Sequence, residues 1–129
     1  MHDVIYPHSL EAGNLVNLEI DWAARQELEF LTCIGNQKTI MLWESIDLRT
    51  FPSSNDFHGK STTVPIGTVA IVLGVVGIPD WVRLYLSLRK EKATNSHRLI
   101  HNDLTVYDIL VSGCKFQAFG CDMNLKRDQ

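Results

Sequence analysis

Few side chains in this sequence have the types and spacing that chemistry requires. The segment 58–62 (HGKST) has the ending of a phosphate-binding loop. That motif needs a glycine five residues before Gly59, where Ser54 stands, and a following helix whose first amides face the phosphates. Pro65 and a predicted strand follow instead. The sequence therefore argues against a nucleotide site.

Two histidines, His97 and His101, are four residues apart, which is a zinc-like spacing if the segment is helical. Arg98 stands where a metalloprotease would carry a glutamate beside the first histidine, and Asp103 is the only nearby candidate for a third ligand. Exposed loop histidines are therefore the preferred interpretation, and we expect no metal.

The three cysteines, Cys33, Cys114 and Cys121, do not form a recognisable motif. An odd number without CxxC spacing is not typical of a secreted disulfide framework, and nothing nearby in the sequence marks a nucleophile. We expect reduced thiols that serve as small core residues in a cytosolic, reducing environment. With no nucleotide, metal or nucleophile pattern, the sequence predicts no cofactor, no catalytic residue and no enzymatic activity.

The charge balance does not favour a dedicated nucleic-acid binder. Twelve Lys and Arg oppose fifteen Asp and Glu, for a net charge of −3. Duplex-binding proteins usually carry a strongly basic stripe, because contacts with phosphates supply much of their affinity. The only basic cluster is interpreted as a solvated loop. It also supports the alternative of a nucleic-acid-binding small barrel, whose contacts would be Arg89, Lys90, Lys92 and Arg98.

The elements that would position any site are mostly strands. With 129 residues, 45% of them hydrophobic, the chain has the size and composition of one folded domain. Asp21 is a plausible N-cap for a helix over residues 22–33, and a short strand over 14–20 precedes it. The apolar run 64–79 is 16 residues long, too short to span a membrane, which takes about 20.

Alternating or β-branched segments predict five further strands, joined by a tight Ser112–Gly113 turn before the last one. Residues 45–65 read as a structured loop and residues 89–103 as an exposed excursion. The strands are expected over 38–44, 66–76, 81–88, 104–111 and 114–119. The expected core is Ile40, Leu42, Val69, Ile71, Leu73, Val82, Leu84, Leu86, Val106, Ile109, Val111 and Phe116. This pattern predicts a mainly β (α+β) fold, a small, strongly bent antiparallel barrel of five strands.

Three stretches carry a family resemblance: TIMLWES (39–45), PIGTVAIVLGV (65–75) and VYDILVSGCKF (106–116). Their order and spacing resemble small SH3-like barrel proteins encoded by tailed bacteriophages. The resemblance covers about residues 38–125. It implies an SH3-like five-stranded barrel over residues 38–129, with residues 1–37 as an N-terminal extension containing the helix. Such phage proteins are generally non-enzymatic virion or accessory components.

The resemblance implies a structural or adaptor protein that docks on other protein subunits of a larger assembly, within a virion or the host cytoplasm. The loop 45–65 and the N-terminal segment are its expected docking surfaces, because apolar anchors in a polar, adaptable frame suit a docking loop. The expected anchors are Trp22, Phe30, Phe51 and Phe57.

Overall fold

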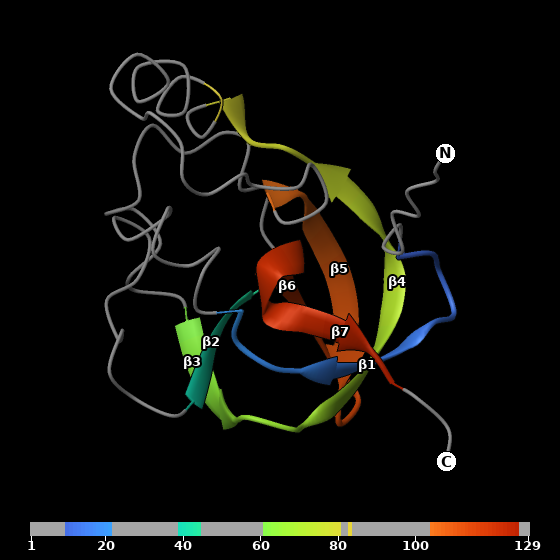
Figure 1. Cartoon of the computed structure of the whole chain (residues 1–129), viewed down its shortest axis with the longest axis vertical. Coiled ribbons are helices and arrows are strands. Elements are labelled where there is room, and N and C mark those ends of the chain that lie inside the picture. Colours follow the sequence, from blue (N-terminus) through green and yellow to red (C-terminus); the bar gives the residue numbers. More distant parts are fainter. Residues whose placement is uncertain (1–9, 22–38, 45–60, 81–82, 84–103, 127–129) are drawn as a thin grey trace, which may run out of the picture.

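The computed structural model describes residues 10–21, 39–44, 61–80, 83 and 104–126. They form one antiparallel sheet of seven strands, which curls into a half-barrel (Figure 1). Its strand order is β3-β2-β6-β5-β4-β1-β7. The strands are β1 (Leu15–Leu18), β2 (Thr39–Glu44), β3 (Ser61–Pro65), β4 (Val69–Gly77), β5 (Val106–Val111), β6 (Cys114–Phe119) and β7 (Met123–Leu125).

The expected fold class, a five-stranded SH3-like barrel with one helix, is wrong in its strand number. Residues 61–65 form β3 and not the end of a loop, and residues 123–125 form β7, which no sequence pattern predicts. Among the described residues only Asp80 and Arg83 are α-helical, and the helix expected over 22–33 lies outside the described part of the chain. The structure is nonetheless mainly β.

The strand expected over residues 81–88 is described only at Arg83. The amide of Arg83 donates to the Pro79 carbonyl, 3.2 Å away and four residues earlier. That is the hydrogen bonding of a helical turn and not of a strand ladder. At this residue the expected strand is therefore wrong, although the sequence alternates cleanly.

A turn over residues 65–68 redirects the chain from β3 into β4. The amide and the hydroxyl of Thr68 both donate to the Pro65 carbonyl, at 3.2 and 2.7 Å. Gly67 has a φ of 96°, which a glycine adopts without the penalty a side chain would bring. As a result β3 pairs with β2, whereas β4 pairs with β5 and β1.

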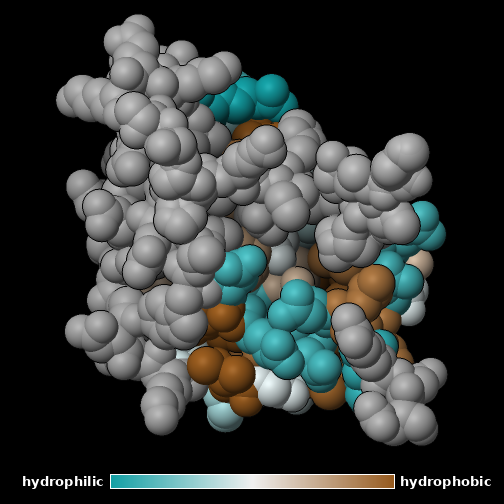
Figure 2. Space-filling model, in the orientation of Figure 1, coloured by the Kyte–Doolittle hydropathy of each residue, from teal (hydrophilic) through white to brown (hydrophobic). Residues whose placement is uncertain are grey.

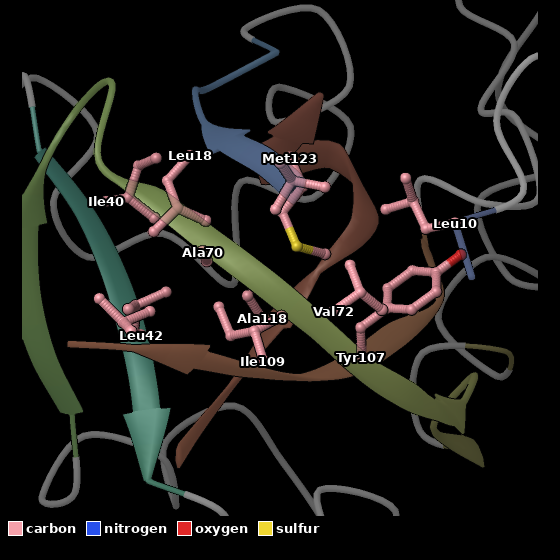
Figure 3. Close-up of a cluster of buried hydrophobic side chains, with 12 residues drawn as sticks. Leu10, Leu18, Ile40, Leu42, Ala70, Val72, Tyr107, Ile109, Ala118 and Met123 are labelled. Atoms are coloured by element: carbon pink, nitrogen blue, oxygen red, sulfur yellow. The ribbon is translucent and has the colours of Figure 1, made fainter. Parts of the chain in front are cut away.

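The hydrophobic core fills the concave side of the curled sheet (Figure 3). Inward side chains from β1, β2, β4, β5 and β6 meet there, and Met123 of β7 covers one side of the cluster. Alternate residues of a strand point to opposite faces, so each strand contributes every second side chain. The cluster consists of Leu10, Val16, Leu18, Ile40, Leu42, Ala70, Val72, Tyr107, Ile109, Val111, Ala118 and Met123.

The expected core is right for β2 and β5 and wrong for β4. Val69, Ile71 and Leu73 are exposed, whereas Ala70 and Val72 point into the core. The inner side of a strongly curled sheet has less room than its outer side, which favours smaller residues there. Five of the remaining expected residues are buried: Ile40, Leu42, Val106, Ile109 and Val111. Phe116 is half-buried. The last three, Val82, Leu84 and Leu86, lie outside the described residues.

The last described strand returns to the beginning of the chain. A short 3-10 turn at Gly120–Asp122 leads from β6 into β7, which pairs antiparallel with β1. The pairing is extended on the Asp122 side, where the Glu19 amide donates to the Asp122 carbonyl at 2.9 Å. β1 is therefore hydrogen-bonded on both sides, to β4 and to β7 (Figure 1). No helix in the described part is long and apolar enough to cross a membrane.

Candidate functional site

The convex side of the sheet carries an uncovered group of apolar side chains. Leu15 of β1 lies directly opposite Ile71 of β4, and Ile71 lies opposite Leu110 of β5. Val69 and Leu73 flank Ile71 along β4 and alternate with the inward residues. Leu15, Ile71, Val69 and Leu73 are 45%, 37%, 41% and 39% exposed, and Leu110 is half-buried. We call these five residues the outer apolar face.

Lysines stand at both ends of the central row of this face. Leu110 lies opposite Lys115 of β6, so Lys115 continues the row beyond β5. At the other end the Lys126 amide donates to the Leu15 carbonyl at 2.9 Å, one pair beyond the β1–β7 ladder. Both lysines are exposed. The row therefore reads Lys126, Leu15, Ile71, Leu110, Lys115 across the sheet.

Another part of the convex side carries apolar side chains that are buried, unlike those of the outer apolar face. Trp43 of β2 and Phe119 of β6 lie outside the concave core, yet they are 1% and 0% exposed. Their ring centroids are 5.7 Å apart in an edge-to-face arrangement (interplanar angle 87°), a favourable geometry for aromatic pairs. Large apolar residues are thus buried on the convex side over β2 and β6 and left exposed over β1 and β4.

A polar pair separates the two parts of the convex side. The Gln117 amide donates to the Asp108 carboxylate, with Nε2 2.9 Å from Oδ1. Gln117 is 4% exposed, and its Oε1 has no hydrogen-bond partner among the described residues. A buried amide that uses its donor but not its acceptor fixes β5 against β6 at a cost in desolvation. The pair has the properties of a structural contact.

The described residues include two of the three cysteines and the residues that follow the phosphate-loop-like segment. No group of three or more His, Cys, Asp or Glu that could hold a metal occurs among the described residues. Cys121 is buried as expected, with its Sγ 4.0 Å from Oδ1 of the buried Asp122, whereas Cys114 is exposed, so its expected core role is wrong. Neither of these two cysteines forms a disulfide. Ser61 and Thr62 begin β3, so no helix follows the phosphate-loop-like segment.

The site residues predicted from the sequence lie outside the described part of the chain. This holds for the expected protein anchors Trp22, Phe30, Phe51 and Phe57, and for the alternative basic cluster Arg89, Lys90, Lys92 and Arg98. These sites stay predictions. The sequence pattern places Val69, Ile71 and Leu73 in the core, so it does not predict the outer apolar face. In a run that is apolar at almost every position, alternation does not reveal which side faces inward.

Figure 2 shows hydrophobic residues at the surface of the described part, in brown, beside hydrophilic ones in teal. Further exposed apolar residues lie away from the outer apolar face or at strand ends: Ile66, Val75 and Leu125. Comparison with the models of known protein families, with curated proteins and with solved structures gives no match for this chain.

Proposed function

We propose that this protein is a non-enzymatic docking module, an adaptor or structural component that binds another protein subunit through its outer apolar face. The observation that carries the proposal is the exposure of Leu15, Val69, Ile71 and Leu73 on adjacent strands. Contiguous exposed apolar patches in soluble proteins commonly mark interaction sites. Single exposed apolar residues are ordinary, but here they form a group.

The rigidity of the underlying strands supports the same function. β4 is paired on both sides, to β1 and β5, so its outward side chains sit on a fixed backbone. Docking onto such a surface requires little ordering of the chain, and therefore a smaller entropic cost than docking through a loop. β-branched residues are also restricted at χ1, which lowers the cost of immobilising Val69 and Ile71 further.

The proposal extends the expectation of an adaptor that works inside a larger assembly. The phage resemblance adds a virion or the host cytoplasm as the place of that assembly. Both remain parts of the proposal, and the loop anchors Phe51 and Phe57 remain a second, independent prediction of where a partner binds. The outer apolar face is preferred because its exposure and its register are described.

Site-specific photo-crosslinking tests the proposal. A photoreactive phenylalanine analogue is placed at Ile71 in one variant and at Thr63 in another, in the full chain produced in its native host. Thr63 is exposed on β3 and is a matched control, because it lies across the sheet from β1 and β4. We expect a discrete protein adduct from position 71 and none from position 63.

A competition variant makes the test specific. Leu15→Asn should weaken the adduct at position 71 at least several-fold, because it places a polar group beside the contact without touching the core. The urea unfolding midpoint should stay near the wild-type value, since Leu15 is already 45% exposed. The proposal is contradicted if positions 63 and 71 give equal yields of adduct. It is also contradicted if Leu15→Asn does not lower the yield of adduct at position 71.

A further inference from the structure

The charges around the outer apolar face specify its partner. We infer that the face binds an apolar protein segment that carries carboxylates on both sides. This inference rests on the proposed function and adds to it the chemistry of the partner. It is carried by the row Lys126, Leu15, Ile71, Leu110, Lys115, in which three apolar side chains stand between two exposed lysines.

The geometry of the row sets the spacing of the partner's charges. From Lys126 to Lys115 the row crosses four strand-to-strand steps, which is about 19 Å along the sheet. Within the row no carboxylate neutralises either lysine. Neither lysine forms an ion pair among the described residues. Two carboxylates on the same side of the sheet, Asp108 and Glu19, accept hydrogen bonds from the neutral amides of Gln117 and Asn124 instead, at 2.9 and 3.0 Å. Carboxylates about 19 Å apart would therefore meet both lysines while apolar side chains cover the centre.

The same charges disfavour a second copy of this chain as the occupant. If two copies stacked their outer apolar faces about a two-fold axis, each row would meet its own counterpart. A lysine of one copy would then face a lysine of the other at both ends, and like charges across an interface disfavour association. An acidic partner gains attraction at both ends instead. Rim charges of this kind act mainly on association rate and on the choice of partner.

Selection from a displayed library of random peptides tests the inference with the purified full chain as the target. The selection is repeated with the charge-reversal variant Lys115→Glu/Lys126→Glu, in which both substitutions lie at exposed positions. We expect peptides with an apolar centre and acidic flanks from wild type, and basic flanks from the reversed variant. A peptide selected on wild type should bind the reversed variant about 3- to 30-fold more weakly.

Two controls separate failure of this inference from failure of the proposed function. Peptides that depend on Leu15 and Ile71 but show no acidic preference overturn the inference and leave the docking function standing. If the selected peptides bind the Leu15→Asn and Ile71→Asn variants as tightly as wild type, or if no peptide is enriched, both the inference and the docking function are overturned. Equal unfolding midpoints for wild type and the reversed variant show that the change in preference does not come from misfolding.

Two further measurements address other occupants. Cosedimentation with phosphatidylserine vesicles that is lost in Lys115→Glu/Lys126→Glu would assign the face to an anionic lipid surface and overturn the inference. Analytical ultracentrifugation that shows a wild-type dimer, dissociated by Ile71→Asn, would assign it to a second copy and overturn the inference as well. We expect a monomer that does not bind the vesicles.

Discussion

The side-chain amide of Gln117 is buried from solvent. Its amide nitrogen bonds the Asp108 carboxylate at 2.9 Å, while its carbonyl oxygen is buried without a partner among the described residues. A neutral pair of apolar residues would avoid this desolvation cost, so the contact contributes positional specificity more than stability. It fixes the register of β5 and β6 beside the outer apolar face.

Removing the acceptor should therefore harm the fold more than removing the whole pair. Asp108→Ala leaves the buried Gln117 amide without its hydrogen bond and should lower the free energy of unfolding by about 1–3 kcal/mol. Asp108→Ala combined with Gln117→Met removes both polar groups and should be more stable than Asp108→Ala alone. Urea unfolding followed by tryptophan fluorescence measures both. Equal stability of Asp108→Ala and wild type would show that the contact is not formed.

At the scale of an element, the β5–β6 hairpin shows how local sequence sets structure. Ser112 and Gly113 connect Val111 to its partner Cys114, with φ values of 51° and 82°. Positive φ at both central residues is characteristic of a type I′ turn, whose twist matches that of the two strands. Ser112 is the only non-glycine residue with positive φ among the described residues, so the turn carries some strain.

Substitutions in this turn should change stability in opposite directions. Ser112→Asn should raise the free energy of unfolding by up to about 1 kcal/mol, because asparagine tolerates positive φ better than serine. Gly113→Val should lower it by at least about 1 kcal/mol, because a β-branched residue opposes that conformation. Thermal unfolding by circular dichroism distinguishes the two. A stabilising Gly113→Val would be incompatible with the turn described.

The elements that the sequence predicted well are those with local signals. The Ser112–Gly113 turn and the strands around it are confirmed, because turn chemistry and alternation are read from neighbouring residues. The sequence predicts a loop where β3 lies, because Ser61, Thr62 and Thr63 form a strand only by pairing with β2. The inward side of β4 was misassigned because both of its faces are apolar. The outer apolar face was lost with it.

For the whole molecule, the stability of the sheet depends on its last strand. Met123 is 5% exposed and lies opposite Leu18, so β7 covers part of the core as well as pairing with β1. A chain that ends after Asp122 should lose more than about 3 kcal/mol of unfolding free energy, since truncating a buried methionine alone costs about 2–5 kcal/mol. Urea unfolding measures this loss.

A chain that ends after Lys126 is the matched control. It retains the β7 ladder and the Lys126 amide bond to Leu15, and it should unfold at the wild-type urea midpoint. If the chain that ends after Asp122 matches it, β7 does not support the core. No local sequence signal pointed to β7, because a three-residue strand is defined by its partner and not by its own pattern.

The pairing of β1 with β7 also has a consequence for folding during translation. Asn124 and Glu19 are 105 residues apart in the sequence, yet their side chains are hydrogen-bonded at 3.0 Å. During translation β1 therefore emerges from the ribosome early. The edge of β1 that pairs with β7 has no partner until nearly the whole described chain has been synthesised. Contacts so distant form late and slowly, and an open strand edge can pair with other chains. Nascent chains on closely spaced ribosomes of one messenger RNA would be able to pair with each other through that edge. Slower initiation of translation spaces the ribosomes further apart, so it should increase the yield of correctly folded protein.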